Sequence, residues 1–210
     1  RARRGATTTT IGDLYRAAPY PGVDTWPVVP WDGGRADDVI AWELRGTSRV
    51  GGVAIDRYVL HHGGGLAMPL LHLHPARAEQ GSSPARPVLL DLGLDGKATF
   101  ASWAPLRARL DAGFDVVSFD LRGTGETRMR YRAAGDDQEL APADEAAAYA
   151  NPLSSVLANH VYNSLLIGRP YFLEMLEDVE IAARFARARL GAPRVVAAGR
   201  GDAALLARSA

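Results

Sequence analysis

Four residues near the carboxyl end of the chain, Gly199-Arg200-Gly201-Asp202, have the composition of a tight turn between a buried strand and a helix. Such a turn exposes one residue at its apex and directs backbone N–H groups and the positive end of the helix dipole toward it. Two kinds of chemistry use this arrangement. One is nucleophilic attack by the serine of a G-x-S-x-G turn, and the other is phosphate binding by a G-x-G-x-x-G/A turn.

The phosphate-binding pattern is matched in spacing by Gly199, Gly201 and Ala204. That fingerprint usually opens the first βαβ unit, and an acidic residue that holds a ribose follows about 20 residues later. Here two apolar strands already precede the turn, and that acidic position would lie beyond Ala210. Dinucleotide binding at 199–204 is therefore the less favoured alternative.

The nucleophile pattern places Gly201 at the position of the attacking serine. Glycine has no side chain that could attack a carbonyl carbon. Asp202 follows at the position whose backbone N–H would stabilise an oxyanion, so we expect its carboxylate to point away and not to replace the serine. The turn therefore predicts the location of an active site without its nucleophile.

His72 and His74 are two residues apart on a predicted strand, so their side chains lie on the same face of it. They are a possible metal pair, but the sequence shows no obvious third ligand, which favours packing or solvation over a metal site. The chain has no cysteine, which excludes disulfides, thiolate ligands and a cysteine nucleophile. We predict no metal and no cofactor.

The composition is that of a globular protein with a sizeable core: 47% of the 210 residues are hydrophobic and 23% are charged. The formal net charge is zero, whereas nucleic-acid and anionic-membrane partners usually leave a basic excess. No apolar run reaches the ~18 residues of a membrane span. We therefore expect neither partner, and the sequence leaves the oligomeric state and the compartment open.

The pattern of apolar residues predicts an α/β fold behind an extended N-terminal arm over residues 1–38. Apolar strands that flank a helix indicate a right-handed βαβ crossover and a parallel sheet, here preceded by antiparallel strands. Strands are predicted at 39–44, 52–61, 66–74, 88–92, 114–119 and 194–198, and helices at 100–112, 156–167 and 171–190. In the last helix we expect an apolar face with Phe172, Leu176 and Val179, and an opposite polar face with Glu174, Glu177 and Asp178.

The loop over 120–127 resembles the D-x-R-G-x-G loop of the α/β-hydrolase superfamily, in which Asp120, Arg122, Gly123 and Gly125 act as structural residues. Within that superfamily the chain is similar, over about 45–206, to bacterial acetyl xylan esterases and prolyl-oligopeptidase-like hydrolases. The other matching motifs are Met68 to Pro75, Asp95-Gly96-Lys97, and Leu165 to Pro170 before the helix that contains Asp178. The resemblance implies the N-terminal half of an α/β-hydrolase fold and cleavage of a small-molecule or carbohydrate ester by a Ser-His-Asp mechanism.

The chain departs from this family where the chemistry should lie. Gly201 replaces the serine, and Gly93-Leu94 stands at the second oxyanion region, where many relatives have His-Gly. The acid and the histidine should follow the serine, yet His160 and Asp178 precede the turn. We therefore expect residues 39–210 to be a partial hydrolase domain that ends after the elbow. Either it is a catalytically impaired esterase-type protein, as a fragment or a divergent copy, or it is a non-catalytic binding or scaffold module.

Overall fold

The computed structural model describes residues 41–62, 66–76, 85–98, 102–128, 156–168 and 170–210. The predicted arm over 1–38 lies outside these residues. So do the Gly63–Gly65 turn and most of the excursion between the second buried strand and the next helix.

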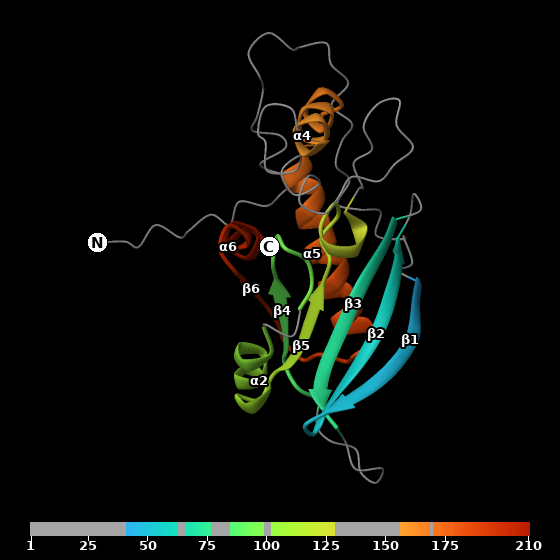
Figure 1. The fold of residues 1–210 in the computed structure, drawn as a ribbon, viewed down its shortest axis with the longest axis vertical. Helices are drawn as coiled ribbons and strands as arrows, with labels where there is room; N and C mark the ends of the chain where they lie inside the picture. Colours follow the sequence, from blue (N-terminus) through green and yellow to red (C-terminus); the bar gives the residue numbers. More distant parts are fainter. Residues whose placement is uncertain (1–40, 63–65, 77–84, 99–101, 129–155, 169) are drawn as a thin grey trace, which may run out of the picture.

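A mixed sheet forms the centre of the molecule (Figure 1). Its order is β1-β2-β3-β5-β4-β6 across the described residues. The pairs β1–β2, β2–β3 and β3–β5 are antiparallel, while β5–β4 and β4–β6 are parallel. The strands are β1 (Ala41–Val50), β2 (Val53–His62), β3 (Leu66–Pro75), β4 (Val88–Leu92), β5 (Asp115–Phe119) and β6 (Val195–Gly199).

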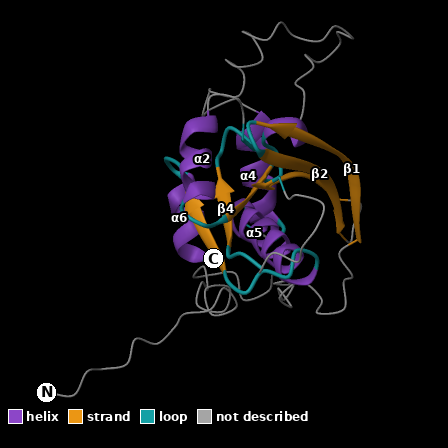
Figure 2. Ribbon diagram, turned by 90° about the horizontal axis from the view of Figure 1, so that it is seen from below, coloured by secondary structure: helices purple, strands orange, loops and turns teal. Residues whose placement is uncertain are grey.

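Helices cover both faces of this sheet, as Figure 2 shows from below. The helical segments are α2 (Trp103–Asp111), the short 3-10 turn η2 (Gly125–Thr127), α4 (Val156–Leu166), α5 (Tyr171–Ala188) and α6 (Ala203–Ser209). The succession β4–α2–β5 is the parallel crossover that the sequence predicts. The α/β class, with antiparallel strands that lead into a parallel sheet, is confirmed.

The alternation of side chains along the strands divides the core in two. Every residue of β4 and β5 is buried, as their continuous apolar runs predict. On one face, Leu89 and Val116 pack with Leu106 and Leu110 of α2. On the other face, a larger cluster that includes Leu90 packs against residues of α5 and α6. The two layers position the loops that follow β4 and β6.

Two details of the expected elements are wrong. The first strand continues to Val50 instead of ending at Leu44, with a bulge between Leu44 and Gly46 that keeps it paired with β2. In α5, Glu177 and Asp178 are buried, at 8% and 1% exposure, whereas Phe172 is 40% exposed. The helical period alone assigns charged residues to solvent, but here a cation from another loop faces them.

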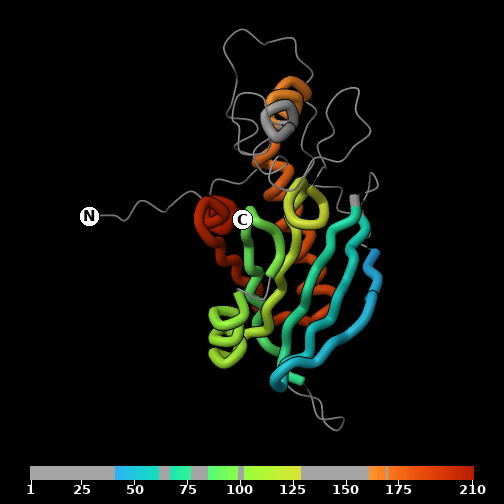
Figure 3. Tube along the Cα trace, viewed as in Figure 1, coloured from blue at the N-terminus to red at the C-terminus, as the bar shows by residue number. Residues whose placement is uncertain are grey.

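The sheet has two ends with different contents, and the tube in Figure 3 follows the chain between them. We call the edge at the carboxyl ends of β4, β5 and β6 the elbow end, because it carries the turn Gly199–Asp202. We call the opposite edge the hairpin end, because it carries the β1–β2 turn at Gly51-Gly52. Residues of β3 run from the elbow end to the hairpin end, since β3 is antiparallel to β5.

Candidate functional site: the strand-to-helix elbow

The turn after β6 is tight because two backbone segments meet at Gly199. The Arg200 N–H donates to the carbonyl of Leu92 at 2.9 Å, and the Ala203 N–H donates to the carbonyl of Arg200 at 3.1 Å. A Cβ on Gly199 would collide with the backbone of Ala203 at the start of α6. Only glycine therefore allows the helix to begin this close to the end of the strand.

The apex of the turn is Gly201, whose φ of +56° lies in the left-handed region. A Cβ placed on it would meet none of the described atoms within 4 Å. A nucleophile elbow needs a turn of this kind, in which a sharp strand-to-helix turn holds one side chain out at the top of the sheet. The position can accommodate a side chain, but the residue present has no reactive group.

Asp202, the next residue, caps α6 by position only. It has helical backbone angles, its carboxylate makes no capping hydrogen bond, and it is exposed. Among the described residues, no hydrogen bond or ion pair joins the Asp202 carboxylate to a base. The structure gives no reason to treat this exposed carboxylate as a nucleophile.

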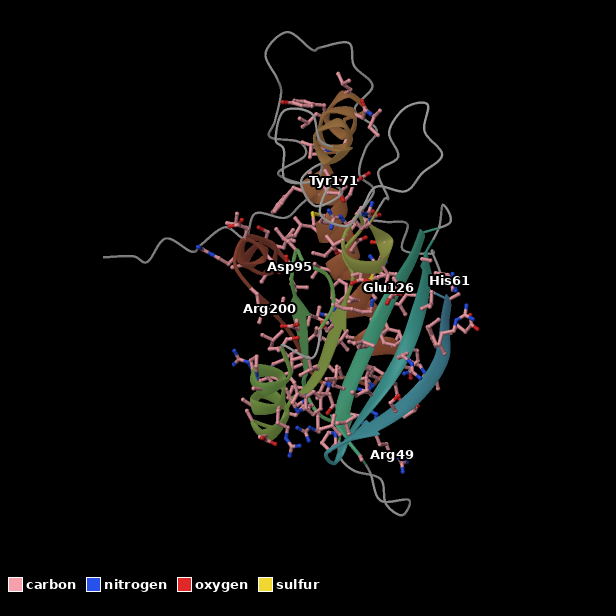
Figure 4. The ribbon with its side chains drawn as sticks, viewed as in Figure 1. Arg49, His61, Asp95, Glu126, Tyr171 and Arg200 are labelled. Atoms are coloured by element: carbon pink, nitrogen blue, oxygen red, sulfur yellow. The ribbon has the colours of Figure 1, made fainter. Side chains whose placement is uncertain are left out.

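The Gly93-Leu94 segment, which the sequence predicts as a second oxyanion region, lies beside the turn, and the side chain of Arg200 extends toward it. The Arg200 Nη2 atom is 3.6 Å from the Asp91 carboxylate and 3.5 Å from the carbonyl of Gly96. A Cβ on Gly93 would collide with the Arg200 guanidinium, so the two segments touch. Figure 4 shows Arg200 and Asp95 near this end of the sheet. The turn and the Gly93-Leu94 segment are thus adjacent, with a cation between them.

The carboxylate of Asp91 forms the ion pair with the Arg200 guanidinium. The sequence did not single out Asp91 as a site residue. It is a buried carboxylate of β4 that also accepts a hydrogen bond from the Ser118 hydroxyl at 3.2 Å. Ser118 Oγ in turn accepts from the Ala98 N–H at 2.7 Å. One sequence signal could have found Asp91: it is the only charged residue of the otherwise apolar strand Val88–Leu92.

The loop that follows β5 is held by Asp120, which is 1% exposed. One carboxylate oxygen accepts from the Lys97 N–H at 2.6 Å, and the other accepts from the Glu126 N–H at 2.9 Å. Cβ atoms on Gly96 or Gly125 would collide with this carboxylate. The Asp95-Gly96-Lys97 and 120–127 motifs of the sequence therefore form one unit, joined through Asp120.

Lys97 adds charge to this unit. Its ammonium group lies 2.7 Å from Asp120 and 2.5 Å from Glu126. Burial lowers the pKa of Lys97, but the hydrogen bonds and negative charges of Asp120 and Glu126 outweigh burial, so that the pKa is raised overall. Lys97 is consequently a charged clamp and has no role as a neutral base.

Arg122 joins the same loop to helix α5. Its guanidinium donates to Asp178 at 2.6 Å and to Glu177 at 2.9 Å, and its backbone N–H donates to Asp178 at 2.7 Å. Burial opposes the charge of Arg122, but these two carboxylates raise its pKa above the ordinary arginine value. On the other side of the pair, burial raises the pKa of Asp178, although Arg122 counteracts this effect.

Gly123 completes the anchorage of the loop. Its φ is +74°, and a Cβ there would collide with the Tyr171 hydroxyl, which donates to the carbonyl of Arg122 at 2.5 Å. Asp178 is fully engaged with Arg122 and is therefore not a free triad acid. His160 belongs to α4, but its side chain lies outside the described set.

The sheet topology points to the same end of the sheet by an argument that does not depend on the side chains. From β4 the chain crosses one face through α2 to β5, and it returns over the other face through α5 to β6 on the far side of β4. The loops after the neighbours β4 and β6 therefore diverge. In open α/β sheets, ligands bind at this switch point at the carboxyl ends of the strands. Gly93-Leu94 and Gly199–Asp202 are those two loops.

The switch point, the elbow and the antiparallel strands before the parallel core define an α/β-hydrolase-type fold. Solved structures of this type resemble the chain. The TM-score is 0.52 for acetyl xylan esterase 1 from a Thermoanaerobacterium species, at 15% identity over 82% of this chain and 48% of the esterase. It is 0.50 for an acetyl xylan esterase from a Paenibacillus species, at 17% identity over 90% of this chain and 56% of the esterase.

These likenesses show the fold, and the chain spans about half of the length of either esterase. No protein-family model matches the sequence, and no curated protein matches it. In the part of the chain that the structure describes, no helix is both long and apolar enough to cross a membrane.

Proposed function

We propose that this chain is an esterase-type α/β-hydrolase protein whose serine mechanism is impaired at the elbow. If a substrate is turned over, its class is a small-molecule or carbohydrate ester. The solved esterases of this fold support the assignment to carboxylic ester chemistry. One observation carries the proposal of impairment: the elbow has a left-handed apex, φ +56°, with open space around it, but the apex residue is Gly201.

A non-catalytic binding module is the second candidate, and the position of Arg200 favours it. An oxyanion hole needs backbone N–H groups directed at a developing negative charge. Here a guanidinium contacts Gly93 and approaches Asp91, which places a permanent positive charge at the switch point. A permanent charge binds an anionic ligand equally well before and after any reaction, so it gives affinity without selective stabilisation of a transition state.

Hydrolysis of p-nitrophenyl acetate tests the impairment. We expect the purified chain to release nitrophenolate no faster than a Gly201→Ala variant, which is a matched control with the same backbone requirement and no nucleophile. Saturable release by the wild type, well above that of the control, would show that a serine-independent mechanism operates and would overturn the proposal.

Gly201→Ser distinguishes the two candidates. The open space at the apex accommodates a hydroxymethyl group, although the left-handed φ costs a non-glycine residue roughly 1–2 kcal/mol. Saturable hydrolysis together with covalent labelling by a fluorophosphonate would indicate that the base and the acid of an esterase are intact. A folded Gly201→Ser chain that is neither active nor labelled would favour the binding module.

A further inference from the structure

A second group of chemically capable side chains lies at the hairpin end, away from the elbow. Asp56 of β2 is the register partner of His72 of β3, and His74 follows two residues later on the same face. The two imidazole rings stack with centroids 4.6 Å apart. One ligand atom from each of the three residues lies within 4.8 Å of the others. Asp56 thus supplies a third candidate ligand atom, which the sequence did not reveal.

His72 is the least satisfied residue of the group. Its side chain is 9% exposed, and neither ring nitrogen has a hydrogen-bond partner among the described residues. The nearest carboxylate oxygens are those of Asp56, 3.9 Å from Nδ1, and Asp115, 3.5 Å from Nε2. Buried polar atoms nearly always have partners, because an unpaired one costs about 1–3 kcal/mol. Something other than a described side chain should therefore satisfy this ring.

The surroundings of His74 indicate which of its nitrogens is available. Its Nδ1 lies 3.0 Å from the carbonyl of Pro75, which can only accept, so Nδ1 carries a proton and donates it. Nε2 then directs either a lone pair or a second proton at Asp56 Oδ2, 3.2 Å away. A lone pair would repel the carboxylate at this distance unless a cation lies between them.

His72 is oriented in the complementary way. Asp115 Oδ2 faces its Nε2, and Arg86 holds the other oxygen of Asp115 through an ion pair of 3.2 Å. A proton on Nε2 toward Asp115 leaves the Nδ1 lone pair directed to the side of Asp56. A carboxylate or carbonyl behind the far nitrogen of each histidine is the usual arrangement around metal-binding imidazoles.

We propose that Asp56, His72 and His74 bind a divalent transition-metal ion, with Zn²⁺ as the best match. The ligand atoms are Asp56 Oδ2, His72 Nδ1 and His74 Nε2. Zinc bonds of about 2.0–2.1 Å in a tetrahedron place neighbouring ligand atoms about 3.3 Å apart. The separations from Asp56 Oδ2 are 3.2 Å and 3.9 Å, and all three ligand atoms lie within 4.8 Å of one another, so binding requires the His72 ring to move toward the other two ligands. The fourth position is open to water or another ligand.

The ion links β2 to β3 beside the amino end of β5 and compensates the negative charges of Asp56 and Asp115. Its location at the edge opposite Gly201 separates it from the elbow, so the proposal does not depend on any esterase activity. The rival occupant of the same space is a second proton on His74 or His72, which would give an imidazolium paired with a carboxylate. Metal titration separates these two cases.

The experiment uses untagged, chelator-treated protein at pH 7.5 and a Zn²⁺ titration in competition with a chromophoric chelator. We expect one Zn²⁺ per chain with a dissociation constant in the micromolar range or below. Asp56→Asn and His74→Ala should weaken binding at least 100-fold. Asp115→Asn should weaken it about 10- to 100-fold, as expected for a group that only orients a ligand.

His61→Ala is the matched control, because His61 is an exposed histidine of the same strand pair and lies near the other end of β2 (Figure 4). It should leave the affinity unchanged. The absence of cysteine leaves only histidine and carboxylate ligands, so little competing binding is expected. No zinc binding by the wild type, or equal binding by Asp56→Asn, would overturn the proposal.

A spectroscopic measurement keeps the test decisive if a variant does not fold. Addition of Zn²⁺ to the wild type should shift the imidazole resonances of His72 and His74 and leave that of His61 in place. Shifts confined to His61, or no shifts at all, would contradict the proposed ligand set.

Discussion

The two ends of the sheet treat buried charge in opposite ways. At the elbow end, Asp120 and Asp178 are almost fully buried, and each is surrounded by N–H donors and one cation. At the hairpin end, His72 is equally enclosed, but neither of its nitrogens has a partner among the described residues. Satisfied networks stabilise loops, whereas an unsatisfied buried group calls for a partner, which we propose is a metal ion. The end that looks like an active site is therefore structurally complete, and the other end is not.

The two ends of the sheet also differ in what they offer: one has a specialised backbone turn, and the other has reactive side chains. The elbow end has the backbone of a catalytic site, with a left-handed apex at Gly201 and a close strand-to-helix contact at Gly199. Its side chains, however, offer no nucleophile. At the hairpin end the left-handed glycines Gly51 and Gly52 only turn β1 into β2, but Asp56, His72 and His74 provide ligand atoms of the kinds that transition metals prefer.

Removal of the central cation at the elbow end should have the largest effect. Arg122→Ala removes the cation that pairs with the buried carboxylate of Asp178, and breaking a buried pair in this way costs about 3–5 kcal/mol. Chemical denaturation should show a loss of this size. Arg45→Ala, at an exposed pair with Glu43, should cost less than about 1 kcal/mol. Equal losses in both variants would mean that the Arg122 network does not stabilise the fold.

Zinc should strengthen the hairpin end and leave the elbow end unchanged. Binding to the folded chain alone adds about 2.7 kcal/mol at a free Zn²⁺ concentration 100 times the dissociation constant. Denaturation with and without Zn²⁺ measures this gain, and Asp56→Asn should abolish it. Hydrogen exchange should slow around His72 and Ala54. If exchange slowed only around Gly201, the ion would be binding at the wrong end.

The two glycines of the elbow should respond differently to alanine. At Gly199 the methyl group meets the backbone of Ala203, which must move with α6, and overpacking of this kind costs about 1–3 kcal/mol. At Gly201 the methyl group enters open space, so only the left-handed φ opposes it, at roughly 1–2 kcal/mol. Gly199→Ala should therefore lower the free energy of unfolding more than Gly201→Ala. A larger loss in Gly201→Ala than in Gly199→Ala would contradict the close backbone contact at Gly199.

The smallest effect concerns Lys97, the only lysine in the chain. Because its pKa is raised, its neutral and reactive fraction is reduced, so amine acylation at pH 8.5 should be several-fold slower than in the unfolded chain. The stability that its ion pairs contribute is complete below the unfolded lysine pKa of about 10.4 and is lost as the pH rises through the raised folded pKa. Mass spectrometry of labelled peptides measures the rate. Acylation as fast as in denaturant would mean that the clamp is open.

The apolar periods along the chain were enough to predict most of the fold. The runs Val88–Leu92 and Phe114–Phe119 predicted strands buried on both faces, and the helix between them indicated a parallel crossover. Glycine spacing also located the turn after β6, because Gly199 has no room for a Cβ and Gly201 adopts a left-handed φ that favours glycine. The polar face of α5 was mispredicted, since a helical period cannot show that Arg122 lies opposite Glu177 and Asp178.

What the sequence determines by itself is local: which segments are strands, which turns need glycine, and that Gly201 matches the serine position of a G-x-S-x-G pattern. These follow from backbone sterics and from the burial of neighbouring residues along the chain. Only the tertiary structure decided that Arg200 reaches Gly93 and that Asp56 lies beside His72 and His74. Contacts of that kind depend on strand register and sheet order, which bring together residues that are far apart in sequence and that no local pattern relates.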